Sequence, residues 1–463
     1  LVGSEMCIRD RNIWKERPEM SMESVFSLAD EYTGEKIGSK LERIREIMKE
    51  NGCNAHVLSS LDDIAWLLNI RGNDIAYCPL VLSYAIVYNN SVELFADIRK
   101  FSDDIINLLA ENQVKIYPYE GIYRKVSEMT SEDKLLLDSS IMNYSLYQAI
   151  SKETVIIDKQ NPEILMKSVK NETQAENLRK AHLKDAVAHT KFMYWLKKNI
   201  GRVEITELSA SARLEGLRAE QEHFLGPSFG PISAYGEHGA IVHYSADEKS
   251  NVPLKEGKLF MTDTGGHYLE GSTDITRTVA LGEVGSIEKE HFTLVARAML
   301  RLANTVFLYG CSGANLDCIA REVFWKEGLN FNHGTGHGVG YLLNIHEGPI
   351  NFRWKEGERP APALEENMVI TDEPGIYIEG SHGIRLENEL LVRKTVKNEY
   401  GQFMNFEILT YVPIDLDAIL SEKMSTEEKE MLNHYHKQVY EKVSPYLSEE
   451  ERIWLKEYTR AVK

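Results

Sequence analysis

One stretch rich in glycine and histidine, residues 332–349, constrains this chain more than any other. It opens Asn-His-Gly-Thr-Gly-His-Gly-Val-Gly and closes His-Glu-Gly-Pro, so that His333, His337 and His346 fall within fourteen residues. The glycines that flank His337 would let the backbone approach closely whatever this histidine binds. The pattern indicates a site, and a glycine-rich hairpin with chance histidines is the alternative.

The stretch matches none of the common short motifs. Glycine recurs at every second position from Gly334 to Gly340, which is not the G-x-G-x-x-G spacing of a dinucleotide site, and no Gly-Lys-Ser/Thr follows for a phosphate loop. His346-Glu347 also lacks the second histidine of a zinc-protease helix. Further ligands must therefore come from other parts of the chain.

Length, charge and cysteine usage exclude several classes of protein. A chain of 463 residues predicts two or three domains. Its net charge of −18 would repel nucleic acid and anionic lipid, and no apolar run approaches the roughly 20 residues of a membrane span. Five scattered cysteines without a C-x-x-C pair favour reduced thiols and a cytoplasmic location.

The first third of the chain alternates between helical and strand patterns. Residues 1–11 start with Leu and show no periodicity, so we expect them to be a scar of cloning or sequencing that is not native sequence. A linker is expected to follow up to residue 36. Residues 37–162 predict an α/β domain without a catalytic constellation. Its expected elements are helices at 37–50, 62–68 and 101–111 and strands at 55–58, 80–88, 92–96, 114–117, 134–138 and 155–158.

The remainder segregates helices from strands, which predicts an α+β domain over residues 163–410. Asn171 and Gln174 form a capping-box pattern ahead of a long amphipathic helix. Further helices are expected at 204–222, 288–309 and 316–327, and short strands and turns lie between them. Residues 411–463 predict a helical C-terminal extension with Trp454 and Leu455 as docking points.

Four acidic residues stand where expected strands end or adjoin. Asp263 and Asp274 lie eleven residues apart on expected neighbouring strands, and Glu373 and Glu387 are separated by fourteen. Singly, each is more often a turn or strand-end residue. Taken with His337, they form a set with a common chemistry.

That chemistry is the binding of two divalent cations. Four carboxylates in one cavity would repel each other and lose hydration, whereas two divalent cations neutralise them and leave a neutral imidazole as fifth ligand. Dominant oxygen ligation favours Mn(II), with Co(II) or Zn(II) as substitutes. Metals about 3.5–4 Å apart share a bridging water and lower its pKa, which indicates a hydrolase.

The same residues carry a resemblance to a known family. Five residues resemble the five ligands of the pita-bread metallopeptidases. They are Asp263 and Asp274 in a D-x(10)-D pattern ending T-D-I-T-R-T, His337 in H-G-T-G-H-G-V-G, Glu373 in D-E-P-G and Glu387 in G-I-R-L-E-N. Residues 228–244 and 346–349 are similar, within that superfamily, to the Xaa-Pro aminopeptidases, and residues 61–74 resemble the middle domain of their long, three-domain form.

The resemblance implies a role for each site residue. The metal ligands would be Asp263, Asp274, His337, Glu373 and Glu387, with Asp274 and Glu387 bridging two metals and Glu373 also shuttling the proton of a bridging hydroxide. His243, His333 and His346 would bind the scissile carbonyl and stabilise the oxyanion. Arg385, expected on the same strand face as Glu387, would contact the substrate or support the ligands.

The implied activity is hydrolysis of the N-terminal Xaa-Pro bond of peptides by a cytoplasmic homodimer. Such a bond lacks the N–H that ordinary peptidases use for alignment, so it requires a dedicated site. A prolidase-like dipeptidase and a catalytically silent binding protein on the same fold are the alternatives; the second predicts missing ligands, and none is missing. The long form carries another α/β domain upstream, which we expect this chain to lack.

Overall fold

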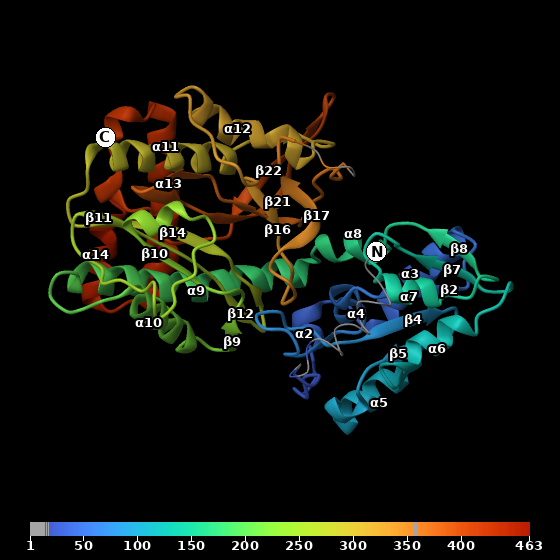
Figure 1. The fold of residues 1–463 in the computed structure, drawn as a ribbon. Coiled ribbons are helices and arrows are strands. Elements are labelled where there is room, and N and C mark those ends of the chain that lie inside the picture. Colours follow the sequence, from blue (N-terminus) through green and yellow to red (C-terminus); the bar gives the residue numbers. More distant parts are fainter. Residues whose placement is uncertain (1–13, 15, 17, 356, 358–359) are drawn as a thin grey trace. The chain divides into compact units, whose positions relative to one another are not determined.

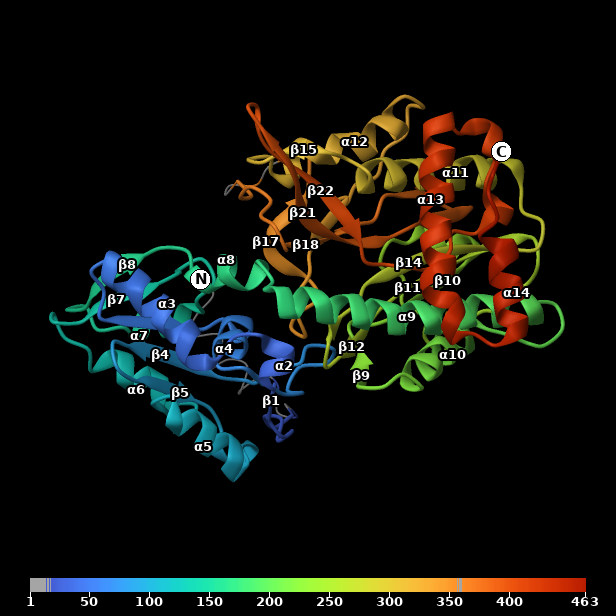
Figure 2. The same cartoon turned by 180° about the vertical axis from the view of Figure 1, so that it is seen from behind.

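The computed structural model describes residues 14, 16, 18–355, 357 and 360–463. The predicted scar at residues 1–11 lies outside this described part. The chain divides into two compact units, one ending at Lys167 and the other covering Ser168–Lys463. Figures 1 and 2 show both units from opposite sides.

The first unit contains a mixed sheet in the strand order β6-β5-β4-β2-β7-β8. Its sheet strands are β2 (Ala55–Leu58), β4 (Tyr84–Tyr88), β5 (Val92–Phe95), β6 (Val114–Tyr117), β7 (Lys134–Leu137) and β8 (Val155–Asp158). A separate antiparallel pair joins β1 (Phe26–Ser27) to β3 (Ile70–Arg71). The helices are α2 (Asp30–Thr33), α3 (Ile37–Glu50), α4 (Leu61–Leu67), α5 (Asp103–Glu111), α6 (Gly121–Ser127), α7 (Tyr144–Ala149) and α8 (Pro162–Ser168), with a 3-10 turn η1 (Ile98–Lys100).

Most predicted elements of this unit are confirmed. Helix α3 ends before Gly52, whose φ of 68° is the left-handed conformation that glycine accepts without strain. One strand is shorter than predicted, because residues 80–83 pack against a loop and not against the sheet: the Leu82 amide donates to Asp74 and the Asp74 amide to Leu80. Helices α6 and α7 were not predicted, since each has only two turns of weak pattern.

The second unit is organised around strands that pair in several small sheets. The strand orders are β10-β11-β14, β13-β12-β9, β19-β20 and β15-β22-β21-β18-β16-β17. The first two comprise β9 (Phe224–Pro227), β10 (Ile232–Tyr235), β11 (Lys258–Thr264), β12 (Gly266–Tyr268), β13 (Gly271–Ser272) and β14 (Ile275–Leu281). The others comprise β15 (Phe307–Leu308), β16 (Gly336–Gly338), β17 (Glu347–Phe352), β18 (Val369–Asp372), β19 (Gly375–Ile378), β20 (His382–Arg385), β21 (Asn388–Asn398) and β22 (Gly401–Ile408).

Helices cover these strands on two sides. Helices α11 and α12 pack together along the sheet that contains β22, and α9 contacts the C-terminal helices α13 and α14 (Figures 1 and 2). The bounds are α9 (Glu172–Asn199), α10 (Glu207–Ala219), α11 (Ser286–Ala303), α12 (Gly313–Trp325), α13 (Thr426–Val443) and α14 (Glu449–Tyr458), with 3-10 turns η2 (Gly236–Ala240), η3 (Leu416–Ala418), η4 (Ser421–Lys423) and η5 (Ser444–Tyr446). In the described part of the chain, no helix is long and apolar enough to cross a bilayer.

Sequence patterns predicted the helices of this unit well and their ends less well. The capping box of Asn171 and Gln174 is present at the start of α9. The helix predicted to reach residue 309 ends at Ala303, because Asn304 caps it and Phe307 then pairs with Met404 of β22. The C-terminal helices dock as predicted: Leu455 is fully buried, and Trp454 packs edge-on against Tyr194 of α9.

Docking of α14 gives a stability prediction. We expect Leu455→Ala to lower the free energy of unfolding by about 2–5 kcal/mol, because it opens a cavity in the core. Ile453 of the same helix is 65% exposed, so Ile453→Ala is a matched control that should change stability by less than about 0.5 kcal/mol. Urea unfolding of the two variants measures this difference, and equal midpoints would contradict the docking of α14.

Candidate metal centre

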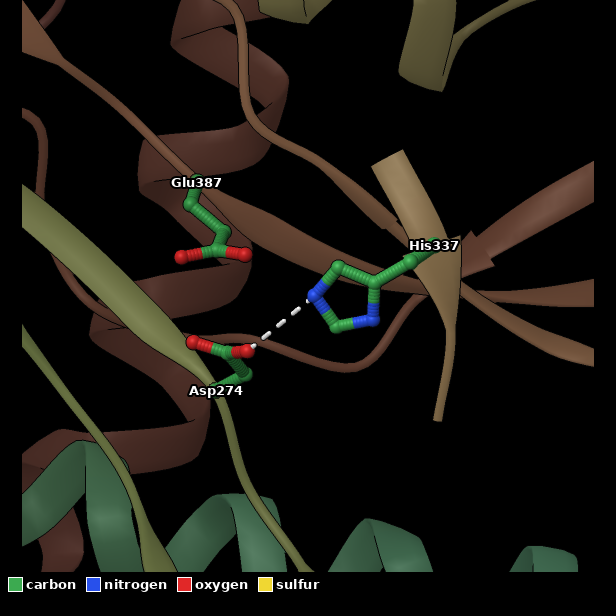
Figure 3. A group of neighbouring side chains, drawn as sticks. All are labelled: Asp274, His337 and Glu387. Carbon is green, nitrogen blue, oxygen red and sulfur yellow. Dashed lines mark ion pairs between the residues drawn. The ribbon is translucent and has the colours of Figure 1, made fainter. Parts of the chain in front are cut away.

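Three predicted ligands form a compact group at the centre of the second unit. Asp274, His337 and Glu387 each offer one ligand atom, and these atoms lie within 4.8 Å of one another (Figure 3). Asp274 directly precedes β14, His337 is the middle residue of β16, and Glu387 lies between β20 and β21. Tertiary folding therefore brings together three segments that are far apart in sequence.

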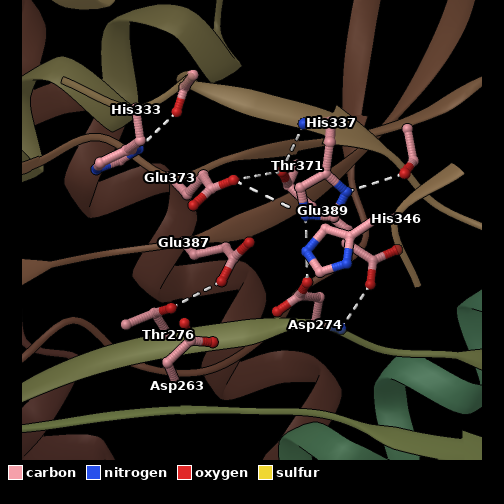
Figure 4. Close-up of polar contacts among 12 residues, drawn as sticks. Asp263, Asp274, Thr276, His333, His337, His346, Thr371, Glu373, Glu387 and Glu389 are labelled. Atoms are coloured by element: carbon pink, nitrogen blue, oxygen red, sulfur yellow. Dashed lines mark hydrogen bonds and ion pairs between the residues drawn. The ribbon is translucent and has the colours of Figure 1, made fainter. Parts of the chain in front are cut away.

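The other two predicted ligands stand beside this group. Glu373 follows β18, and its Oε1 lies 3.8 Å from Nε2 of His337, which in turn lies 3.5 Å from Oδ2 of Asp274. Asp263 is on β11, where it pairs in register with Thr276 of the neighbouring β14. Figure 4 shows all five side chains, and the predicted strand adjacency of Asp263 and Asp274 is confirmed.

Hydrogen bonding fixes the tautomer of His337. Its Nδ1 lies 2.9 Å from the carbonyl oxygen of Gly338, which can only accept, so Nδ1 carries the proton. Nε2 is the nitrogen that faces the carboxylates, and in the neutral imidazole it carries the lone pair that can bind a metal. This arrangement is the one that metal-ligating histidines adopt.

The carboxylates repel each other strongly. Burial, followed by the charges of Asp263 and Glu373, raises the pKa of Asp274 well above its ordinary value. Burial and the charge of Asp274 do the same to the pKa of Glu387. Burial also raises the pKa of Glu373, although His337 and Arg385 oppose that shift. The donor set thus fits a bound divalent cation, which would replace protons as the source of neutralising charge.

Polar residues that the sequence analysis missed hold the ligands in place. The Thr276 hydroxyl donates to Oε2 of Glu387 at 2.7 Å, and the Thr371 hydroxyl accepts from the His337 amide at 3.0 Å. Buried Glu389 accepts from the Asp274 amide at 2.7 Å and lies 3.1 Å from Nε2 of His182. Thr276, Thr371 and Glu389 each lie two residues from a predicted ligand, a spacing that returns to the same face of a strand and could have revealed them.

Arg385 connects Asp263 to an aromatic residue. Its guanidinium donates to Oδ2 of Asp263 and, at 2.7 Å, to the hydroxyl of Tyr377. Tyr377 in turn donates to Nε2 of His333 at 2.9 Å, since Nδ1 of His333 is the nitrogen that donates to the Gly334 carbonyl. Arg385 ends β20 and Glu387 lies two residues further on, and their side chains point to the same side, because Nε of Arg385 and Oε2 of Glu387 contact the Thr276 hydroxyl at 3.3 and 2.7 Å.

The three histidines predicted to handle substrate differ in their surroundings. Both ring nitrogens of His333 are engaged, and burial together with Arg385 lowers its pKa to about 4. His346 is exposed, with its ring centroid 4.4 Å from that of His337. In Figure 4, His333 and His346 lie on opposite sides of the carboxylates. His243 is exposed and close enough to lower the pKa of both.

Comparisons with known proteins identify the family. Family models match the creatinase/prolidase N-terminal domain at residues 16–174, metallopeptidase family M24 at 176–394 and the C-terminal region of peptidase M24 at 402–462. Aminopeptidase P1 of Arabidopsis thaliana is 33% identical over 97% of this chain and 77% of its own length. Xaa-Pro aminopeptidase 1 of Dictyostelium discoideum is 36% identical over 94% of this chain and 69% of its own length.

The chain belongs to the Xaa-Pro aminopeptidase family of M24 metallopeptidases. The solved X-prolyl aminopeptidase of Caenorhabditis elegans, described as a cytosolic enzyme with a di-nuclear active site, matches with a TM-score of 0.92 and 34% identity over 98% of this chain and 75% of that one. An Xaa-Pro dipeptidase from Bacillus anthracis matches with a TM-score of 0.66 and 25% identity over 82% of this chain and 99% of that one.

Family membership confirms the predicted fold class and enzyme class. The catalytic unit is a pita-bread metallopeptidase domain of α+β architecture, preceded by a creatinase-type α/β domain. The enzyme class of an Xaa-Pro aminopeptidase is that of a metallo-exopeptidase. The group around Asp274, His337 and Glu387 is therefore the candidate metal centre of a metallopeptidase of this family.

The glycines beside His337 allow neighbouring strands to pack closely against β16. A Cβ on Gly336 would stand 1.8 Å from the carbonyl oxygen of Thr371, and one on Gly338 would stand 2.2 Å from that of Glu347. Any side chain at these two positions would therefore push β17 or β18 away from the strand that carries His337.

This packing gives a prediction for Gly336→Ala. The added methyl group must push β16 away from Thr371 and displace His337, so we expect a loss of about 1–3 kcal/mol in unfolding free energy and weakened Mn(II) binding. Gly348→Ala is the control, because a Cβ there meets nothing within 4 Å. Calorimetric unfolding and Mn(II) titration of both variants check this, and unchanged Mn(II) affinity in Gly336→Ala would contradict it.

The raised carboxylate pKa values give a second prediction. In the metal-free protein, Glu387 is destabilising above its unfolded-state pKa, and its full cost is reached once the pH exceeds the raised folded-state pKa. Glu387→Gln should therefore raise the melting temperature of chelator-treated protein by a few degrees at pH 8, and less at pH 5. Exposed Glu379→Gln is the control and should change nothing. A lower melting temperature for Glu387→Gln at pH 8 would contradict this account.

Proposed function

We propose that this protein hydrolyses the N-terminal Xaa-Pro bond of peptides at a dinuclear metal centre. The observation that carries the proposal is that Nε2 of His337 faces the buried carboxylates of Asp274 and Glu387 and the partly buried one of Glu373, an excess of negative charge that two divalent cations would balance. The family and its C. elegans member support the same reaction.

The proposed ligands are Asp263, Asp274, His337, Glu373 and Glu387, with Asp274 and Glu387 between the two cations. Oxygen donors dominate, so Mn(II) is the proposed native metal, with Zn(II) or Co(II) as substitutes. When bound, the metal pair would supply a Lewis acid for the scissile carbonyl and a bridging hydroxide at neutral pH. Glu373 has the most accessible of the buried carboxylates in this group and is the proposed proton carrier.

The surrounding side chains divide the remaining tasks. His346 and His243 are exposed and can donate to the substrate carbonyl as it gains negative charge. His333 can take part only if Tyr377 releases its Nε2. The Arg385 guanidinium donates to both Asp263 and Tyr377. We therefore propose that Arg385 orients Asp263 and that it affects the substrate only indirectly, through Asp263 and Tyr377.

The wider predictions also stand as proposals. We propose a cytoplasmic location, supported by the description of the C. elegans relative as cytosolic and by the described cysteines, which are all free. A homodimer is proposed from the family resemblance alone. Peptides with proline at the second position are the proposed partners, and the net charge of −18 argues against nucleic acid. The division into segments 1–36, 37–162, 163–410 and 411–463 remains a proposal as well.

Activity against a matched substrate pair tests the proposal. With Mn(II), the protein should release the first residue from Ala-Pro-Ala, and His337→Ala should lower kcat/KM at least about 10³-fold because a metal ligand is lost. The release of free alanine measures both. Cleavage of Ala-Pro alone would indicate a prolidase, and no cleavage with any metal would indicate a silent binding protein; either result would overturn the assignment.

A further inference from the structure

A cavity of about 350 Å³ borders the proposed metal centre, because His337 belongs to its lining. His346, Arg353 and Lys355 belong to the same lining. The volume falls in the range of small-molecule sites, so the space suits a short peptide segment. The cavity is lined by β17 and the residues that follow it, together with Ala314 in the first turn of α12.

Among the described lining residues, the exposed charged side chains are the cations Arg353 and Lys355. Arg353 lies across Gly334, where its Nε would stand 3.0 Å from a Cβ, and Lys355 lies over the ring of Trp354 at 4.7 Å. Glu347, the acid among the lining residues that the structure describes, is buried and pairs with Lys170 at 2.6 Å. The positive charges of exposed Arg353 and Lys355 can therefore attract an anionic group in the cavity.

The first turn of α12 adds to the same field. Ala314 is its second residue, and the positive end of a helix dipole favours anions. Gly313 brings this turn against β17, since a Cβ at that position would stand 1.8 Å from the Asn351 carbonyl oxygen. Asn351 is also the register partner of His337. Strand β17 therefore contacts both the first turn of α12 and the strand that carries His337, and Arg353 directly follows β17.

The negative charge of the metal-centre acids and the positive charge of Arg353 and Lys355 would orient a bound peptide. The α-ammonium group of a substrate is attracted to the acidic residues and repelled by Arg353 and Lys355, whereas a carboxylate experiences the reverse. A peptide whose Xaa-Pro bond lies at His337 would thus extend its C-terminal part into the cavity. This orientation rests on the function proposed above.

We propose that this cavity is a subsite for a peptide carboxylate located after the proline, recognised by Arg353 and Lys355. The carboxylate has two possible sources, the C-terminus of a short peptide or the side chain of an acidic residue in the third position. Both would pair with the same cations. The subsite predicts a preference for short or acidic peptides.

Matched peptides distinguish the two sources. Ala-Pro-Ala is compared with its C-terminal amide, and Ala-Pro-Glu-amide with Ala-Pro-Gln-amide. We expect the charged member of at least one pair to have a KM about three- to fivefold lower with similar kcat, the size of effect that exposed ion pairs give. Arg353→Gln and Lys355→Gln should each reduce that ratio. Lys437→Gln, which removes an exposed lysine of α13, is the control.

A binding measurement separates failure of the subsite from failure of the proposed function. Calorimetric titration of the Mn(II)-loaded protein with Pro-Ala and with Pro-Ala-amide needs no turnover, and the free carboxylate should bind about three- to fivefold more tightly in the wild type and equally in Arg353→Gln/Lys355→Gln. If both peptide pairs are cleaved with equal KM, or if a preference survives both substitutions, the subsite is overturned while the function stands. Equal affinity of Pro-Ala and its amide for the wild type, together with equal affinity of Pro-Glu-amide and Pro-Gln-amide, overturns the subsite even if no peptide is cleaved.

Discussion

Mutual repulsion among buried carboxylates is the constraint on which the rest of the catalytic unit depends. Asp274, Glu373 and Glu387 would not remain close together and charged without compensating positive charge. The surrounding structure holds them in place through specific hydrogen bonds: the Thr276 hydroxyl donates to the Glu387 carboxylate, and Glu389 fixes the backbone of Asp274 by accepting from its amide. The fold therefore holds a site that is unfavourable when metal-free and balanced when divalent cations are bound.

Close packing of strands gives this site its rigidity. β16 carries His337, and its glycines allow the carbonyl groups of Thr371 and Glu347 to approach closer than any side chain would permit. Those two carbonyls belong to β18, which leads directly to Glu373, and to β17, which follows His346. A change at one glycine thus moves several functional groups at once, because packed strands do not deform independently.

Electrostatic asymmetry connects the metal centre to substrate selection. The metal centre holds the acids, whereas the exposed charged side chains in the described lining of the adjoining cavity are Arg353 and Lys355, beside the first turn of α12. A peptide has the same asymmetry, with an ammonium group at its start and a carboxylate at its end. In this proposal the chain direction of the substrate is fixed by long-range charge before any specific contact is made.

By itself, the sequence determined the fold class, the family and the order of the five proposed ligands, because these depend on local periodicity and on residues at recognisable spacing. It also located most helices, and it erred at their ends and at residues 80–83, where tertiary contacts override an apolar run. Only the tertiary structure decided what the glycines beside His337 accommodate, that both nitrogens of His333 are engaged, and that Arg353 and Lys355 line a cavity with His337. These depend on contacts between segments that are distant in sequence, which no local pattern encodes.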